Sequence, residues 1–191
     1  MKMIDKPLNV EKSYAVLIPL IKKGEESFIV LERRSNNISQ PNEISFPGGS
    51  IERLETPLEA AIRETSEELG IAKNKITVQK SMPSLITPFN SIIYIYVGHL
   101  NSEELEPNKD EVAELIYLPV SELENLEAKV YRSEISLKLP NDFPFNQIPK
   151  GELYPWKTGH YDIYFYEFEK HTIWGITAKI LNQFNLKRKE I

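Results

Sequence analysis

The chain alternates short apolar, β-branched runs with polar turns, and this pattern predicts a series of strands. The expected strands cover residues 14–20, 28–31, 44–46, 76–82, 91–100, 111–118, 131–139 and 161–168. Residues 22–26 form a polar turn, so the first two strands are expected to form a hairpin. The run at 91–100 is continuously apolar and predicts a central strand buried on both faces. Loops are expected at 36–42, 83–90 and 101–110, and a short capped helix at 121–124.

Residues 57–69 carry clear helix start and stop signals. Thr56 can cap the helix, Pro57 suits its first position, and Glu59 completes a capping box. Gly70 is the preferred residue type just past a helix end. At about 100° per residue, an apolar stripe runs along one side of this helix. Its members are Leu58, Ile62, Thr65 and Leu69, with Ala61 at the edge. We expect the stripe to face the core.

The C-terminal region predicts a second amphipathic helix after an irregular segment. Apolar residues recur with a helical period from Ile173 to Phe184, and the helix is expected to end in the basic residues 187–189. Residues 140–160 are rich in proline and aromatic residues and show no regular period. A long irregular segment of this kind predicts a loop that covers or contacts a substrate, or simple packing over the core.

The composition narrows the class of protein. The 191 residues suit one domain, residues 1–191, and the net charge of -5 disfavours a nucleic-acid partner. The absence of cysteine excludes disulfides, thiolate metal sites and a cysteine nucleophile. The N-terminus has no apolar signal region and no apolar run reaches membrane-spanning length. We therefore expect a cytoplasmic protein without a membrane partner, as a monomer or homodimer.

Three acidic residues on the first helix are the main candidates for chemistry. Glu64, Glu67 and Glu68 stand three and four positions apart, where like charges repel by about 0.2–0.5 kcal/mol per pair on an exposed helix. Arg63 can neutralise only part of this repulsion. A bound divalent cation would reverse it, because Mg²⁺ takes oxygen ligands from carboxylates and phosphates. For these three residues alone, a solvated acidic face is the simpler interpretation.

The longer spacing favours the metal interpretation. The pattern G-x5-E-x7-R-E-x-x-E-E-x-G-I is filled by Gly49, Glu55, Arg63, Glu64, Glu67, Glu68, Gly70 and Ile71. This stretch, residues 49–71, resembles the Nudix box. Thr65 stands where that family usually has an aliphatic residue, and its hydroxyl needs a partner, for which we expect the carbonyl of Ala61. The resemblance implies an α/β fold: an α/β/α sandwich with a mixed sheet between helices and the box as a loop-helix-loop.

Further segments resemble the coenzyme A diphosphatase branch of that family. They are Arg34-Ser35, residues 43–49 (EISFPGG), 85–89, 107–114 and 173–178. The branch implies hydrolysis of coenzyme A or acyl-CoA to 4′-phosphopantetheine, or its acyl form, and adenosine 3′,5′-bisphosphate. Residues 36–42 lack the basic residue and the glycine usual in the branch signature. Hydrolysis of ADP-ribose or of another nucleoside diphosphate or triphosphate therefore stays open as an alternative.

The resemblance also implies roles for individual residues. Glu64, Glu67 and Glu68 would bind Mg²⁺ or Mn²⁺, with the carbonyl of Gly48 as a further ligand. Either Glu67 or Glu111 would take the proton of the attacking water, and Arg63 would pair with Glu55 to brace the loop against the helix. Arg33 or Arg34 would bind an outer phosphate of the small-molecule diphosphate. Two other hypotheses remain: a non-catalytic nucleotide-sensing module, and a purely structural acidic helix.

Overall fold

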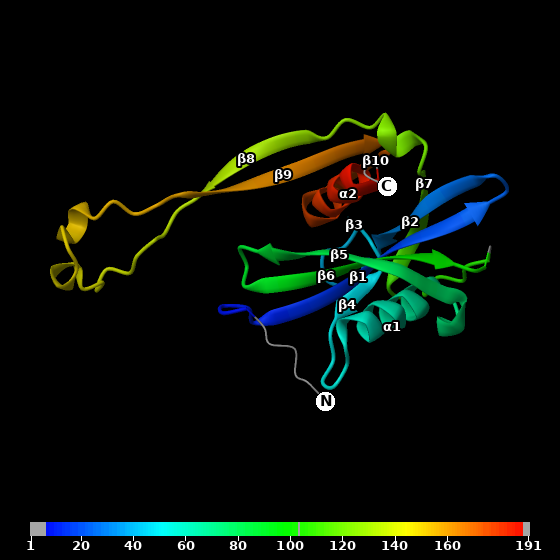
Figure 1. The fold of residues 1–191 in the computed structure, drawn as a ribbon, viewed down its shortest axis with the longest axis horizontal. Helices are drawn as coiled ribbons and strands as arrows, with labels where there is room; N and C mark the ends of the chain where they lie inside the picture. The colour runs from blue at the N-terminus through cyan, green and yellow to red at the C-terminus, as the bar shows by residue number, and fades with distance from the viewer. Residues whose placement is uncertain (1–6, 103, 189–191) are drawn as a thin grey trace.

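The computed structural model describes residues 7–102 and 104–188, which form two sheets and two α-helices (Figure 1). The strands are β1 (Lys12–Lys23), β2 (Glu26–Arg34), β3 (Ile44–Ser45), β4 (Gly48–Ser50), β5 (Ile76–Thr87), β6 (Ser91–Leu100), β7 (Val112–Pro119), β8 (Lys129–Ile135), β9 (Gly159–Phe168) and β10 (His171–Trp174). The α-helices are α1 (Pro57–Leu69) and α2 (Gly175–Arg188). Single 3₁₀ turns lie at Lys73–Lys75, Glu122–Glu124, Phe145–Gln147 and Gly151–Leu153.

Strand β1 is the central element of the larger sheet. It pairs in parallel with β6 along residues 12–20, and antiparallel with β4 and with the start of β2. Strand β2 runs on past β1 to pair with β7 and β3, and β5 covers the other edge of β6. The sheet is therefore mixed, and its pairing fixes the glycines of β4 directly beside β1.

The two α-helices cover opposite faces of this sheet (Figure 1). Successive residues of β1 point to opposite sides, so Ile18 packs in the cluster that includes Leu181 and Phe184 of α2. Leu17 packs instead in the cluster that includes Leu69 of α1. A mixed sheet between helices was the expectation drawn from the resemblance, and the structure confirms it.

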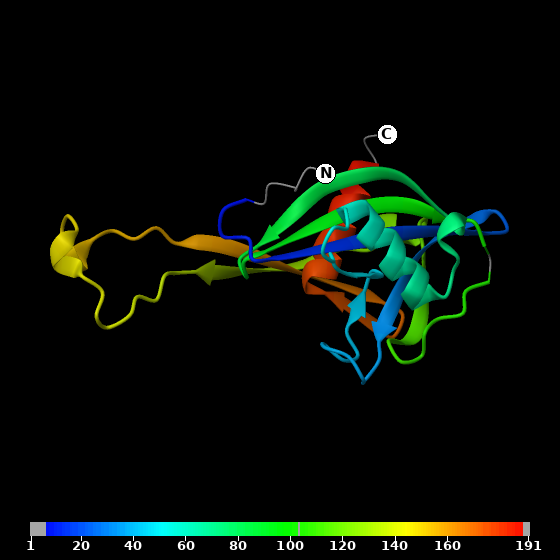
Figure 2. The ribbon, with the colours of Figure 1, turned by 90° about the horizontal axis from the view of Figure 1, so that it is seen from below.

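Strands β8 and β9 form a hairpin that projects from the body of the molecule, as Figures 1 and 2 both show. We call residues 129–168 the arm. Every residue of β8 is exposed, and β8 forms the outer edge of the small sheet β10-β9-β8. At the far end of the arm, aromatic side chains pack against one another. The ring centroid of Phe143 lies 4.9 Å from that of Phe145 and 5.9 Å from that of Trp156. The tip is thus a local aromatic cluster.

Several predicted boundaries were wrong, for identifiable reasons. The expected loop at 83–90 is mostly strand, because β5 continues to Thr87 through register shifts that accommodate Pro83. Strand β8 covers 129–135, not 131–139, because a hairpin partner decides where its pairing stops. The predicted second helix begins at Gly175, since Ile173 belongs to β10. The helix expected at 121–124 is a single 3₁₀ turn without a side-chain cap.

The irregular segment 140–160 does not cover the body in this structure. It lies largely at the tip of the arm, away from α1 (Figures 1 and 2). Its aromatic residues contact one another, which accounts for a composition unlike that of a disordered loop. Within the described residues, neither helix combines the length and the apolar character needed to cross a bilayer.

Candidate active site

Helix α1 forms through the local signals that its sequence carries. The Thr56 hydroxyl accepts from the Glu59 amide, and the Glu59 carboxylate accepts from the Thr56 amide at 2.8 Å, which completes the capping box. Gly70 ends the helix in the left-handed region with φ 62°. The Thr65 hydroxyl donates to the Ala61 carbonyl at 2.7 Å, as predicted.

The buried face of α1 is rotated relative to the predicted stripe. Leu58 is 38 % exposed, whereas Ala60, Ala61 and Glu68 are buried with Thr65 and Leu69. The prediction for Leu58 was wrong because small Ala60 and Ala61 let the helix approach β1 on their side. This rotation takes Glu68 into the interior.

Glu68 is held directly against the glycine turn. The Gly48 amide donates to its Oε2 at 2.8 Å, and the side chain is only 4 % exposed. Gly48 has φ 153° and lies so close to β1 that a Cβ there would meet Val16 Cα at 2.7 Å. A Cβ on Gly49 would collide with the carboxylate of Glu64. The two glycines therefore form a cradle against the carboxylates of α1.

Glu32, on β2, is a site residue that the sequence interpretation missed. It is 0 % exposed, its Oε1 accepts from the Ser45 hydroxyl at 3.1 Å, and its Oε2 has no hydrogen-bond partner among the described residues. The available signal was strand alternation: Glu32 lies two residues after Val30, and Val30 packs in the same cluster as Leu69 of α1. An ionisable residue at an inward position of an apolar strand marks a functional candidate.

The carboxylates of this region strongly affect one another. Burial, followed by the charge of Glu32, raises the pKa of Glu68 well above its ordinary value. Burial also raises the pKa of Glu32, and the charges of Glu111 and Glu64 add to this. Burial likewise raises the pKa of Glu64, against the opposing effect of Arg63. Glu32, Glu64, Glu68 and Glu111 therefore form one electrostatic group, which we call the acidic cluster.

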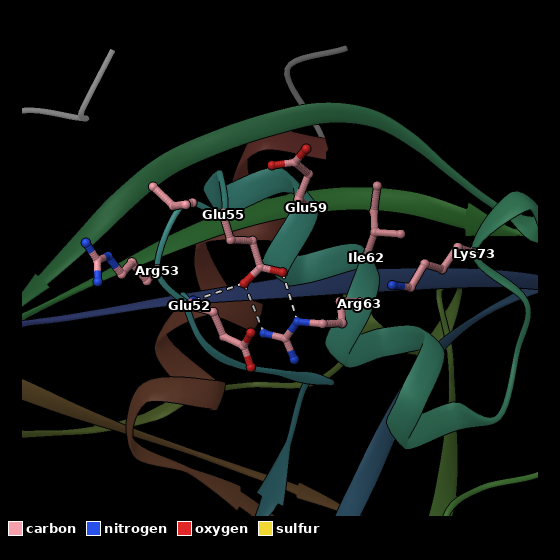
Figure 3. Close-up of a pocket in the computed structure, with 8 residues that line it drawn as sticks. Glu52, Arg53, Glu55, Glu59, Ile62, Arg63 and Lys73 are labelled. Atoms are coloured by element: carbon pink, nitrogen blue, oxygen red, sulfur yellow. Dashed lines mark hydrogen bonds and ion pairs between the residues drawn. The ribbon is translucent and has the colours of Figure 1, made fainter. Parts of the chain in front are cut away.

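Arg63 braces the loop that precedes α1 (Figure 3). Its Nε is 2.8 Å from Glu55 Oε1, and its other nitrogens reach the Ser50 carbonyl at 3.2 Å and Glu64 at 2.9 Å. The predicted Arg63–Glu55 pair is confirmed. Glu67 also binds Arg63, at 3.1 Å, but its side chain is 52 % exposed and lies at the edge of the group. Arg63 and Glu55 also line a shallow hollow of about 370 Å³, together with Glu59 and Lys73, whereas no member of the acidic cluster lines it.

The two adjacent arginines of β2 have different surroundings. Arg33 is tied to Glu114 at 3.0 Å, and Lys170 binds the same carboxylate. Arg34 donates to the Ser39 carbonyl at 2.9 Å and lines a large cavity next to the glycine cradle. Its charge lowers the pKa values of Glu32 and Glu68, so Arg34 lies near the acidic cluster. Of the two predicted phosphate ligands, the structure brings only Arg34 to the cavity.

This cavity measures about 840 Å³ and adjoins the glycine cradle. Gly48, Gly49 and Ser45 form part of its floor. Its apolar wall comes from separate elements of the chain: Ile93, Phe89, Ile135, Ile163, Trp174, Ile176 and Ile180. Ile135 and Ile163 belong to the paired strands β8 and β9 of the arm, which we call its root, so the root reaches the cavity and the predicted segment 140–160 does not.

The acidic cluster suits a hard divalent cation in its chemistry. Its donors are carboxylate oxygens, those of Glu32 and Glu68 buried, whose mutual repulsion a cation would relieve, and the Oε2 of Glu32 has no hydrogen-bond partner among the described residues. Within residues 7–102 and 104–188, however, no three acidic or histidine side chains are already gathered for coordination. Glu68 is engaged by the Gly48 amide and Glu64 by Arg63. The chemistry of these residues therefore suits a divalent cation. Glu64 and Glu68 can act as its ligands once their side chains rotate away from their present partners.

Replacing Arg63 with lysine tests the brace. A lysine ammonium cannot span Glu55, Glu64 and the Ser50 carbonyl together, so we expect a loss of about 1–2 kcal/mol in the free energy of unfolding, measured by urea denaturation. The control is Arg132→Lys, which alters the exposed ion pair with Asp162 on the arm. We expect only a small shift of the urea midpoint there. Equal shifts for both variants would contradict the role assigned to Arg63.

The raised carboxylate pKa values predict a pH dependence for the metal-free protein. Folded Glu32 and Glu68 hold protons above 4.5, the ordinary glutamate value, so their stabilising contribution is complete below that pH and is lost as the pH rises. The melting temperature of the natural chain in EDTA should therefore decrease as the pH is raised from 5 to 8. Glu32→Gln should flatten the slope, and Glu25→Gln, in the exposed β1–β2 turn, should not. A slope unaffected by Glu32→Gln would show that Glu32 titrates normally.

Comparison with known sequences identifies the family of proteins to which this arrangement belongs. The sequence model of the NUDIX domain matches residues 11–139. The chain therefore belongs to the Nudix hydrolase family, and α1 with its flanking loops is the Nudix box of the fold.

Individual relatives are distant but cover much of the chain. An uncharacterized Nudix hydrolase, NudL, of Pectobacterium atrosepticum is 24 % identical over 184 residues, 95 % of this chain and 85 % of its own length. The peroxisomal coenzyme A diphosphatase NUDT7 of Mus musculus is 29 % identical over 110 residues, which are 56 % of this chain and 47 % of that protein. Among solved structures, a MutT/nudix family protein from Enterococcus faecalis aligns with 99 % of this chain and 65 % of its own, with a TM-score of 0.57 and 18 % identity. This last likeness supports the fold.

Proposed function

We propose that this Nudix hydrolase cleaves the diphosphate of coenzyme A or acyl-CoA with water. The products are 4′-phosphopantetheine, or its acyl form, and adenosine 3′,5′-bisphosphate. The reaction depends on Mg²⁺ or Mn²⁺ and takes place in the cytoplasm. The mouse relative named as a coenzyme A diphosphatase supports this choice of substrate.

One observation carries the proposal: the glycine cradle is shared by the acidic cluster and the large cavity. Gly48 binds Glu68 and also lines the cavity, and Gly49 lies against Glu64 and lines it too. A substrate in the cavity can therefore place its diphosphate at the cradle. The apolar wall suits a pantetheine or acyl chain, and Arg34 suits a phosphate.

The residues of the chain act in distinct ways. Glu64 and Glu68 would hold the cation, which would neutralise the diphosphate and lower the pKa of a bound water. Glu111 accepts the proton of the attacking water. We favour Glu111 over Glu67 because the charge of Glu111 acts on the buried Glu32, whereas Glu67 is paired with Arg63 and half exposed. Arg63 positions Glu64 and the loop without contacting the substrate.

Product analysis across a panel of substrates tests the proposal. Coenzyme A, ADP-ribose and 8-oxo-dGTP are each incubated with Mg²⁺ or Mn²⁺, with EDTA as the control. We expect coenzyme A to have a kcat/KM at least about tenfold above the other two, a difference of about 1.4 kcal/mol in transition-state binding. A preference for ADP-ribose or 8-oxo-dGTP would reject the coenzyme A assignment.

Melting temperatures measured with the same two ions and with EDTA, beside the product analysis, separate the remaining hypotheses. If metal raises the melting temperature but no substrate is cleaved, the chain is a nucleotide-sensing module. If neither ion changes the melting temperature, the acidic cluster is structural only.

A further inference from the structure

Glu32 is buried in a way that its neighbours do not explain. Its register partners on either side of β2 are Ser45 on β3 and Leu115 on β7, so it lies in the middle of the pairing. The Ser45 hydroxyl donates a hydrogen bond to Oε1 of Glu32 at 3.1 Å. The other oxygen, Oε2, has no hydrogen-bond partner in the described part of the chain. A buried carboxylate oxygen without a hydrogen bond is strongly disfavoured unless something satisfies it.

No basic side chain of the described residues supplies that partner. The positive charge of Arg34 favours ionised Glu32, but Arg34 forms no ion pair with it, and its Nε donates to the Ser39 carbonyl. The remaining charges that act on Glu32 come from Glu111 and Glu64 and are of its own sign. The position therefore calls for a proton or for a cation that does not belong to the chain.

The orphaned oxygen lies within the acidic cluster of the glycine cradle. The Ser45 hydroxyl binds Glu32 and the Gly48 amide, three residues further on, binds Glu68, so one short segment holds both carboxylates. The charge of Glu32 also has the largest effect of any single charge on the pKa of Glu68. Glu68 comes from α1 and Glu32 from β2, so together they approach the cradle from two elements. Two carboxylates from separate elements provide the oxygen donors that Mg²⁺ and Mn²⁺ prefer.

We propose that Glu32 is an additional direct ligand of the divalent cation, bound together with Glu68. This inference rests on the proposed function, because it places a further residue at the same metal site. Ser45 orients the ligand, since it holds Oε1 and leaves Oε2 for the ion. Pairing of β2 with β3 on one side and β7 on the other fixes the backbone of Glu32, so this ligand is preorganised. Glu64, by contrast, must first break its ion pair with Arg63.

Mn²⁺ affinity, measured by titration calorimetry without substrate, tests the inference. Glu32→Gln keeps the shape and the Ser45 contact but removes the ligand charge, and we expect its Mn²⁺ dissociation constant to rise at least about tenfold. Glu25→Gln is the matched control, with an exposed carboxylate removed and no change expected. Glu32→Gln should melt no lower than the natural chain in EDTA, because glutamine never places a charge at this buried position.

The outcomes are distinguishable. If the natural chain binds Mn²⁺ and Glu32→Gln binds it within twofold, Glu32 is only a buried protonated acid and this inference is overturned, while the proposed function stands. If the natural chain binds no Mn²⁺, the proposed function itself fails. Should Glu32→Gln not fold, a manganese-soaked crystal of the natural chain decides the matter. The anomalous peak should lie about 2.1 Å from Glu32 Oε2, and a peak beyond coordination distance would overturn the inference.

Discussion

Glu68→Gln should lower turnover of the preferred diphosphate by about 100-fold or more while leaving the fold intact. The amide oxygen of glutamine can still accept from the Gly48 amide, so the 2.8 Å contact to the loop is retained. The charge that binds the cation is lost. Because glutamine stays neutral at a buried position where glutamate becomes charged only as the pH rises, the variant should melt at or above the natural temperature in EDTA.

Turnover is measured by steady-state kinetics with saturating Mn²⁺, and the fold of the same samples is checked by circular dichroism. Glu25→Gln, in the β1–β2 turn, serves as the matched control and should keep full activity. A folded Glu68→Gln enzyme with turnover within a few-fold of the natural chain would remove Glu68 from the metal site.

Gly48→Ala is expected to cause the largest loss of stability of the substitutions considered. A Cβ at this position would meet the backbone of Ala15 and would lie 2.7 Å from Val16 Cα, at a φ of 153° that side chains rarely adopt. Neither obstacle is a flexible side chain, so β4 must move away from β1. We expect a loss of about 3 kcal/mol or more in the free energy of unfolding, together with loss of the Glu68 contact.

Gly24→Ala separates backbone strain from crowding. Gly24 also has a positive φ, 61°, but nothing lies within 4 Å of its missing side chain. Alanine there should cost about 1 kcal/mol, the usual left-handed penalty. Urea denaturation of both variants, compared at equal m values, makes the test. A Gly48→Ala loss no larger than that of Gly24→Ala would show that β4 is free to shift.

The parts of the site that could be predicted from sequence are those fixed by local geometry. Helix α1 begins and ends where Thr56, Glu59 and Gly70 predicted, because caps depend on residues a few positions apart. The Arg63–Glu55 pair was accessible for the same reason. Glu32 was not singled out, because its importance comes from burial between β3, β7 and α1, and nothing in its own segment encodes those neighbours.

Long-range pairing also explains the incorrect boundaries. Strand β5 extends to Thr87 because β6 offers it a partner to the end, which outweighs the local turn signals at Pro83. Leu58 was assigned to the core on helical period alone, but the close packing of Ala60 and Ala61 against Ala15 set the actual face. In both cases the tertiary contact prevailed over the local preference.

The division of the arm into root and tip has a consequence for how this chain can vary between lineages. The root carries Ile135 and Ile163 into the cavity wall, so selection on substrate fit acts there. In the tip, the rings of Phe143, Tyr154 and Trp156 contact one another, and none of the tip residues lines the cavity. We therefore expect insertions and deletions to be tolerated in the tip more readily than in the root.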